Sequence, residues 1–249
     1  MTAKKKVLCL IHARGGSTRL PGKNIKSFVG QPLVTRSIKQ ALSLPFIDRV
    51  ILDTDSPEIA VIGRRAGAEV PFLRPKYLAT SKSQMIDTIL HMLKKLRLEG
   101  YVPEYVLILP PNVPLRETKD IENHWQVMLE EEKKKRGATS VVTICSTHPR
   151  LYHLDKHNYL HLENKTIVNS TNNQAWKSGY ILNGFVFLVK TQTLLKERQY
   201  NVTRKTRGVI VPRWRSIDID YSEDWVIGEL FYRNRAKIKH VLKHFSKQR

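Results

Sequence analysis

A short apolar run at residues 7–11 leads directly into a glycine-rich, positively charged loop at residues 13–24. The run predicts a buried strand. The loop predicts an anion site at the end of that strand, because glycines let backbone N–H groups approach a phosphate closely. Gly15 and Gly16 give this access, and the positive charges come from Arg14, Arg19 and Lys23. The spacing matches neither the phosphate-loop nor the dinucleotide fingerprint, so two interpretations stand: another kind of phosphate site, or a solvated basic turn.

Strand-like runs alternate with amphipathic, helix-like segments along the chain. We expect strands at residues 6–11, 49–53, 106–109 and 140–144, and helices at 32–42, 57–66, 83–98, 118–135 and from 222 onward, the last capped by Ser222. Strands joined through helices form right-handed crossovers and a mostly parallel sheet. The expected fold class is therefore α/β, a Rossmann-like sheet flanked by helices, in one domain over residues 1–249. Residues 148–182 are more polar, and we expect a hairpin and a flap there.

Two carboxylates stand two positions apart late in the chain, at Asp218 and Asp220, and they alternate with Ile217 and Ile219. On a strand such residues project from the same face, so the aspartates would hold one hard divalent cation while the isoleucines pack inward. The alternative is a half-exposed edge strand with its polar side chains in water. Ligands of open α/β sheets bind outside the carboxyl ends of the strands. We therefore expect residues 14–23, 53–55, 110–116 and 218–220 to surround one cleft.

Six motifs stand in the order in which the acylneuraminate cytidylyltransferases carry them. They are RGGS with LPGKN (14–17, 20–24), RP with LA (74–75, 78–79), P with PLR (111, 114–116), NG (183–184), SIDID (216–220) and EDW (223–225). From residue 6 to 225 the chain resembles this family, the CMP-sialic acid synthetases and their relatives acting on legionaminic and pseudaminic acids. The resemblance implies a nucleotide-diphospho-sugar transferase fold, transfer of CMP from CTP to an acidic sugar, Mg²⁺ as cofactor, and a homodimer formed through the flap.

The resemblance also implies roles for particular residues. Catalysis would fall to Arg14, Lys23, Asp218 and Asp220, and Mg²⁺ binding to Asp218 and Asp220. Nucleotide binding would fall to Arg14, Gly15, Gly16, Ser17, Arg19, Lys23, Asn24, Arg74 and Ser83. Binding of the sugar acid would fall to Asn112, Arg116, Arg150, Gln174, Asn183 and Phe187. For Asn24 the alternative is a cap on the following turn.

Other positions depart from the family pattern. These departures fall in the phosphate loop and in the expected pockets for the base and the sugar acid. The chain has Thr18 where the family has lysine, Ser81 where it has aspartate, Pro110 where it has glutamine and Phe187 where it has tyrosine. Two hypotheses follow: an active enzyme with altered sugar specificity, and a catalytically degraded homologue that still binds a nucleotide. His12 stands beside the loop where proline is usual. We consider for it a phosphate contact, a role as proton acceptor, and a plain hydrogen bond to the backbone.

The chain has a formal charge of +21, from 43 Lys and Arg against 22 Asp and Glu. Such a surface attracts anions, so a third hypothesis is a protein that associates with nucleic acids or with membrane surfaces. The basic clusters are not interleaved with aromatic residues that could stack on bases, and the sequence has no zinc-binding spacing, so nothing specific supports nucleic-acid binding. Basic residues on solvated helix faces explain the charge better. No apolar stretch is long enough to cross a membrane. Cys9 and Cys145 lie in apolar runs, so we expect reduced core thiols and a cytoplasmic location.

Overall fold

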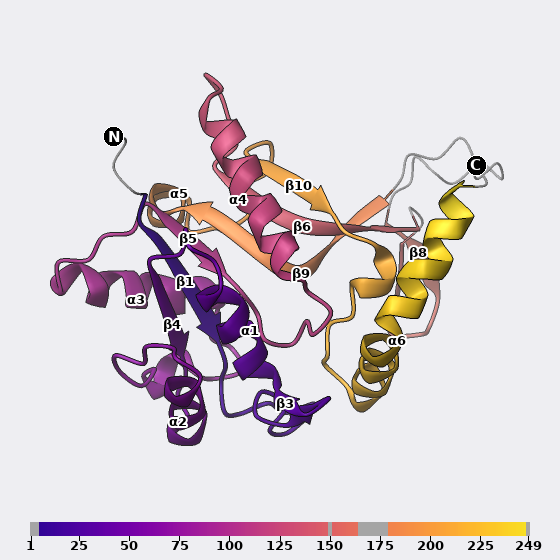
Figure 1. Ribbon diagram of the computed structural model, residues 1–249, viewed down its shortest axis with the longest axis horizontal. Coiled ribbons are helices and arrows are strands. Elements are labelled where there is room, and N and C mark those ends of the chain that lie inside the picture. Colours follow the sequence, from indigo (N-terminus) through magenta and orange to yellow (C-terminus); the bar gives the residue numbers. More distant parts are fainter. Residues whose placement is uncertain (1–4, 149–150, 164–178, 248–249) are drawn as a thin grey trace.

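The structure is a computed structural model that describes residues 5–148, 151–163 and 179–247. Six strands of this part form one sheet in the order β10-β6-β9-β5-β1-β4 (Figure 1). They are β1 (Val7–His12), β4 (Arg49–Asp53), β5 (Tyr105–Ile108), β6 (Ser140–Thr147), β9 (Gly179–Lys190) and β10 (Thr206–Ile210). β1 is parallel to β4 and β5, and β10 is parallel to β6, whereas β9 runs antiparallel between β5 and β6. The sheet is mixed but mostly parallel, which confirms the expected fold class.

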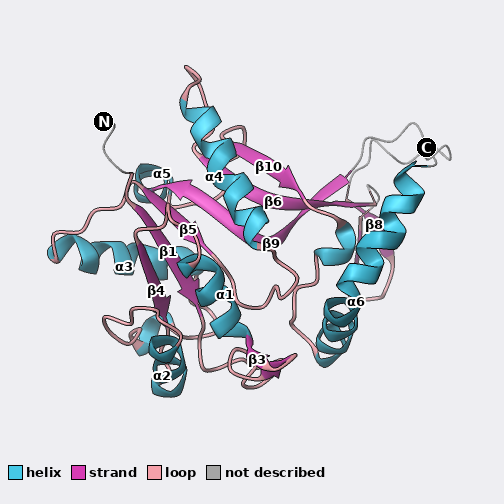
Figure 2. Ribbon diagram, viewed as in Figure 1, coloured by secondary structure: helices cyan, strands magenta, loops and turns pink. Residues whose placement is uncertain are grey.

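Helices cover both faces of this sheet (Figure 2). The first face carries α1 (Leu33–Leu42), α2 (Pro57–Arg65) and α4 (Thr118–Glu132), and the second carries α3 (Met85–Leu98) and α5 (Thr191–Glu197). The last helix, α6 (Ser222–Lys247), lies at the end of the molecule opposite α3 (Figure 1). Short elements complete the described chain: β2 (Ser27–Phe28) with β3 (Gln31–Pro32), β7 (Tyr152–Leu154) with β8 (Leu160–Leu162), and the 3₁₀ helices η1 (Lys76–Leu78) and η4 (Arg213–Arg215).

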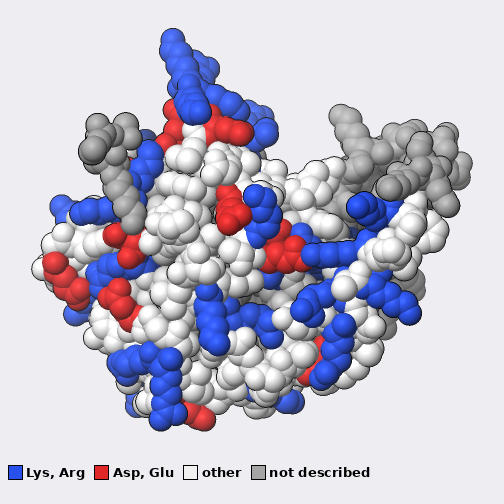
Figure 3. Space-filling view, viewed as in Figure 1, with Lys and Arg blue, Asp and Glu red and all other residues white. Residues whose placement is uncertain are grey.

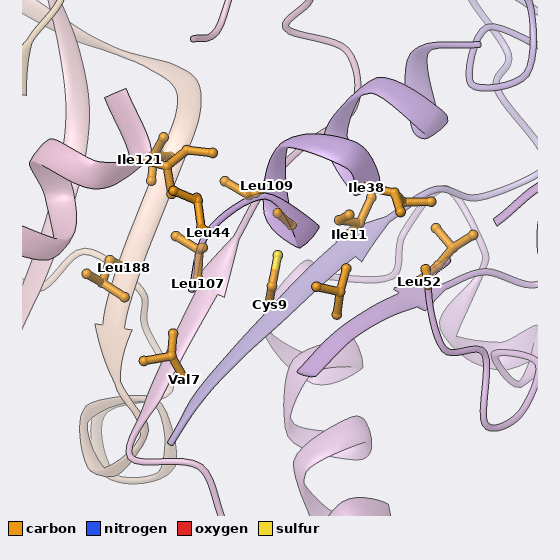
Figure 4. Close-up of a cluster of buried hydrophobic side chains, with 14 of the residues drawn as sticks. Val7, Cys9, Ile11, Ile38, Leu44, Leu52, Leu107, Leu109, Ile121 and Leu188 are labelled. Carbon is orange, nitrogen blue, oxygen red and sulfur yellow. The ribbon is translucent and has the colours of Figure 1, made fainter. Parts of the chain in front are cut away.

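The central strand β1 supplies the core on both faces. Successive strand residues point to opposite sides, so Val7, Cys9 and Ile11 face α1 and α4, and Leu8 and Leu10 face α3. Figure 4 shows the first set between side chains of the neighbouring strands β4 and β5. All five side chains are fully buried, and each such aliphatic side chain contributes about 1.5–3 kcal/mol to folding. This rigid strand fixes the start of the loop that follows it.

A separate apolar cluster ties the C-terminal helix to the N-terminal half of the chain. Phe28 and Leu33 pack with Ile219 and Trp225. The rings of Phe28 and Trp225 meet edge to face with their centroids 5.4 Å apart. Residues near both ends of the described chain therefore fix the position of residues 216–220.

Several sequence expectations need correction at this point. Residues 216–220 are an extended segment without strand pairing, not a strand, and they follow the 3₁₀ helix η4. Ser222 is the first residue of α6, and the carboxylate of Asp224 caps the helix by accepting from the N–H groups of Asp220 and Tyr221 at 3.0 and 2.8 Å. The strands β9 and β10 were not expected. The predicted hairpin is confirmed at β7–β8, and Cys9 and Cys145 are buried and free, as expected.

Positive charge is spread over much of the surface. Figure 3 shows Lys and Arg scattered across the face in view, with a projecting group at the end of α4. That group contains the exposed residues 133–136, three lysines and one arginine. Among the helices of the described residues, none combines the length and the apolar character that crossing a membrane requires.

Candidate active site

The loop after β1 is held from two sides. The N–H of Ala13 donates to the carbonyl of Asp53 at 3.1 Å, and the N–H of Gly15 donates to the carboxylate of Asp55 at 2.9 Å. From the other side, the buried amide of Asn24 donates to the carbonyl of Arg14 at 3.0 Å. Asn24 thus closes the loop on itself, a role that neither sequence interpretation included.

The two glycines of the loop have different surroundings. A Cβ on Gly15 would lie 3.1 Å from Cβ of Ser56, the residue that caps α2. Glycine at position 15 therefore lets the loop pack against that helix, and its N–H is already bonded to Asp55. A Cβ on Gly16 would meet none of the described atoms within 4 Å. Among the described residues, the space on the side-chain face of Gly16 is therefore open.

Two cavities adjoin at the carboxyl ends of β1 and β5. The first cavity has a volume of about 180 Å³ and is lined by His12, Arg14, Ser17, Thr18, Arg19, Leu20, Lys23, Asn24, Pro111, Asn112 and Asp220. The second cavity has a volume of about 340 Å³ and is lined by His12, Arg14, Arg74, Leu78, Thr80, Ser81, Ser83, Met85 and Thr88. The lining of the first cavity includes three cationic side chains from the loop, and most of the lining of the second cavity consists of apolar and hydroxyl side chains. His12 and Arg14 line both.

The acidic segment and the cationic loop meet in the first cavity. Lys23 Nζ lies 2.8 Å from Asp220 Oδ1 and donates to the carbonyl of Ile219 at 2.7 Å, and Arg19 reaches Asp220 Oδ2 at 2.8 Å. The N–H of Ile219 donates to the carbonyl of Asn112 at 2.8 Å, and its side chain is fully buried. These contacts give residues 216–220 a fixed course without a sheet.

Asp218 has the electrostatics of a cation ligand. It accepts a hydrogen bond from the amide of Asn112. Desolvation raises its pKa to about 6, with the neighbouring carboxylate of Asp220 adding to the rise, so a divalent cation would relieve a repulsion built into the segment. Among the described residues no group of three or more His, Cys, Asp or Glu side chains is arranged around a metal position. Asp218 and Asp220 fit a cation that takes its remaining oxygen ligands from a phosphate substrate.

A buried ion cluster lies between the two cavities. Asp53 is 1% exposed and binds the Arg74 guanidinium at 2.8 Å and Nδ1 of His12 at 2.8 Å. Burial alone would raise the pKa of Asp53, but the hydrogen bonds and charges of His12 and Arg74 outweigh it, and the net shift is downward. Asp53 is therefore a carboxylate at neutral pH, and it orients both His12 and Arg74.

Other predicted site residues lie elsewhere. Arg116 is buried, and its guanidinium donates to the carbonyls of Pro110 and Phe185 at 2.9 and 2.8 Å, so its donors are used within the core. Phe187 is buried in β9 against the ring of Tyr200. The structure brings neither to the lining of the two cavities. Arg150 and Gln174 lie outside the described residues.

Two further predicted residues hold neighbouring segments in place through side-chain hydrogen bonds. The hydroxyl of Ser83 donates to the carbonyl of Tyr77 at 3.0 Å and accepts from the N–H of Thr80 at 3.1 Å, which shapes one wall of the second cavity. The amide of Asn183 donates to Ser216 Oγ at 2.9 Å at the start of the acidic segment. Both are positioned to support the site.

The comparison with protein families agrees with this geometry. The model of the family described as cytidylyltransferase matches residues 8–224, a span that contains the loop, both cavities and the acidic segment. The chain belongs to the cytidylyltransferase family.

The curated proteins that are similar to this cytidylyltransferase include enzymes named for legionaminic, pseudaminic and acylneuraminic acids. It is 28% identical to the CMP-N,N'-diacetyllegionaminic acid synthase of Legionella pneumophila, over 90% of this chain and 95% of that protein. It is 26% identical to the pseudaminic acid cytidylyltransferase of Campylobacter jejuni, over 92% and 97%. An N-acylneuraminate cytidylyltransferase of Escherichia coli is 27% identical over 94% of this chain and 54% of that longer protein.

Solved structures show the same fold. A CMP:2-keto-3-deoxy-manno-octonic acid synthetase complexed with CTP superposes with a TM-score of 0.68 at 14% identity, covering 93% of this chain and all of that one. A 4-diphosphocytidyl-2C-methyl-D-erythritol synthase from Anaerococcus prevotii gives 0.63 at 14% identity, covering 92% and 99%. The cytidylyltransferase is a nucleotidyltransferase on this α/β fold.

Sequence reasoning placed Asp55 and Asn112 beside the cleft, and Asn112 among the sugar-acid ligands, but it did not predict the structural contacts that they make. Asp55 fixes the loop through Gly15, and Asn112 fixes both Ile219 and Asp218. The only signal was their place at strand ends, which predicts nearness to the cleft but no partner.

Proposed function

We propose that this chain transfers the cytidylyl group of CTP to a nonulosonic sugar acid. The anomeric hydroxyl of the acid attacks the α-phosphorus, a new oxygen–phosphorus bond forms, the bond to the β-phosphate breaks, and pyrophosphate leaves with the displaced electron pair. The hydroxyl proton passes to solvent or to a basic group. The supporting observation is the first cavity, where three loop cations face the acidic segment.

The chain's own contribution is alignment and neutralisation of charge. Arg14 and Lys23 would bind the triphosphate, and the open backbone at Gly16 would contact it. Asp218 and Asp220 would hold Mg²⁺, which when bound neutralises phosphate charge and favours ionisation of the attacking hydroxyl. Both oxygens of Asp220 are paired with Arg19 and Lys23, and these two cations would turn toward the phosphates when a nucleotide binds. The cations and the acids would thus exchange partners as the substrate binds.

The direct test is pyrophosphate release with Mg²⁺, the four nucleoside triphosphates in turn, and a panel of nonulosonic and 3-deoxy sugar acids. We expect release with CTP and one nonulosonic acid, and loss of release in Asp218→Asn. A matched control is Glu122→Gln, which neutralises a carboxylate on α4 that pairs with Lys119. Binding of CTP without release under any combination would instead support a nucleotide-binding homologue that has lost catalysis.

We also propose a homodimer through the hairpin β7–β8. Large apolar side chains are exposed on the hairpin and on the adjacent start of β9: Leu151, Leu154, Tyr159, Leu160, Tyr180, Ile181 and Leu182. Such a patch favours a protein–protein contact. Light scattering after gel filtration should give twice the chain mass, and Leu160→Glu should reduce it to one chain; a monomeric parent would refute the proposal.

A further inference from the structure

His12 has one ring nitrogen engaged and one without a partner. Its Nδ1 lies 2.8 Å from Asp53 Oδ2, and this contact fixes the plane of the ring. Its Nε2 is buried and makes no hydrogen bond to any described residue. The ring lines both cavities. Leaving a buried polar atom without a partner is unfavourable, so an atom of this kind at a cavity wall indicates a ligand contact.

The charges around the ring decide which ligand group that is. Asp53 faces the ring from the end of β4, Arg74 from the segment before η1 with its nitrogen 3.4 Å from Nδ1, and Arg14 from the loop. His91 of α3 also interacts electrostatically with Asp53. Burial lowers the pKa of His91. Across the first cavity stand Arg19, Lys23 and Asp220. With one carboxylate and two arginines close by, the groups around the ring carry a net positive charge that an anion would balance.

The two cavities indicate which anion lies beside the ring. The first has the loop cations that suit a polyphosphate, and the second has Leu78, Met85 and several hydroxyl groups that suit a neutral ring. In a nucleotide spread over both, the group at the shared wall lies at the junction of nucleoside and polyphosphate. That group includes the α-phosphate, the phosphate at which transfer occurs.

We infer that His12 binds the α-phosphate of the nucleotide as an imidazolium, donating from Nε2 while Asp53 holds Nδ1. The inference rests on the proposed function. It makes nucleotide binding and ring protonation favour one another, so binding takes up a proton. Arg14 beside it supplies fixed charge, whereas His12 supplies charge that depends on pH.

The experiment is calorimetric titration of CTP without Mg²⁺ at pH 7, in two buffers of different ionisation enthalpy, repeated from pH 6 to 8. The parent chain should take up a fraction of a proton, and its affinity should fall by up to about tenfold per pH unit as the ring deprotonates. His12→Asn retains an amide nitrogen where Nδ1 stands, and His12→Gln retains one near Nε2. In both variants the only proton uptake left should be that of CTP itself. The His12→Asn variant should bind CTP at least about tenfold more weakly than the parent chain.

The control is His91→Gln, the neighbouring histidine that lines neither cavity, which should keep the parent's proton uptake. Binding of pyrophosphate, which contains no α-phosphate, should depend on His12 far less than binding of CTP. A purely structural His12 would leave His12→Asn with the parent's affinity and uptake, and that result overturns the inference. Tight CTP binding without His12-dependent proton uptake would also overturn it while leaving the proposed function intact. A parent chain that binds no CTP would refute both.

Discussion

Lys23 Nζ lies 2.8 Å from Asp220 Oδ1, although 197 positions separate the two residues in the sequence. One belongs to the loop proposed for phosphate and the other to the segment proposed for the metal. Lys23 also donates to the carbonyl of Ile219. The same ammonium therefore orders the acidic segment and provides charge for a substrate.

Replacing Lys23 should be far more harmful than replacing Arg19. Lys23 is mostly buried and bonds two groups of the acidic segment, whereas the Arg19 side chain is 53% exposed. We expect Lys23→Met to lower kcat/KM for CTP by about 100-fold, equivalent to about 3 kcal/mol, and Arg19→Met by less than about tenfold. Steady-state pyrophosphate release measures both. Equal losses in the two variants would contradict the assignment.

The two aspartates should differ in their effect on stability although both are needed for activity. The pKa of Asp218 is raised to about 6, so above pH 6 the folded chain holds an ionised carboxylate that it disfavours. Asp218→Asn should raise Tm by about 1–3 °C at pH 7.5, a small gain because Asp218 keeps solvent access. The gain should shrink as the pH falls below about 6 and disappear near pH 4, where this carboxyl is protonated in the unfolded chain as well. Asp220→Asn should lower Tm, because it removes the ion pairs with Lys23 and Arg19. Differential scanning calorimetry would test this, and a fall in Tm for both would refute it.

His124 should make the fold weaken in mild acid. The ring is fully buried between the carbonyl of Asp120 and the hydroxyl of Thr143, and burial lowers its pKa to about 4. An unfolded histidine binds its proton near pH 6.5, so between these values the unfolded chain holds more protons than the folded one. The free energy of unfolding should fall as pH drops from 6.5 to 4, by on the order of 3 kcal/mol.

Urea unfolding at pH 7 and pH 5 would measure this loss. In His124→Gln the difference between the two pH values should shrink, and in His157→Gln, a change of an exposed hairpin histidine, it should stay as in the parent. A His124→Gln variant whose stability changes between the two pH values as much as the parent's does would show the assignment to be wrong.

Arg116 should behave as a core residue. Its guanidinium bonds two backbone carbonyls and the side chains of Ser37 and Gln40. Arg116→Met leaves these buried acceptors without donors and should lower the free energy of unfolding by about 3 kcal/mol. The KM for the sugar acid should change little in the folded fraction. A large rise in that KM with unchanged stability would instead support the sequence-based role in substrate binding.

The sequence predicts the parts of this fold that depend on local pattern. The continuous apolar run of β1 and the helical spacing of apolar residues in α3 predict the type and the burial of each element directly, because both patterns depend on neighbours in the chain. β9 was not predicted, since its first half is exposed and its second half buried, and a left-handed Gly184 interrupts the register between them. The segment at residues 216–220 shows strand-like alternation, but its order comes from distant partners.

The same distinction between local pattern and distant partners applies to the candidate site. Residue type made the cations of the loop and the aspartates candidates, because phosphate and metal chemistry restrict the choice of side chain. Type alone could not separate Arg14, which lines the cavities, from Arg116, which is buried among backbone carbonyls. The cluster of His12, Asp53 and Arg74 joins residues 62 positions apart, and only the crossover of β1 and β4 brings them together.

The packing of Phe28 and Leu33 against Ile219 and Trp225 has a consequence for biosynthesis. A ribosome adds about 5–20 residues per second, so about 10 to 40 s pass between the emergence of Phe28 and that of Trp225. Throughout that interval the nascent chain exposes an uncovered aromatic surface, together with a phosphate loop whose Lys23 has no acidic partner yet. Synthesis of residues 216–225 therefore completes both, and this protein should depend on chaperones that bind apolar surfaces until these residues have emerged.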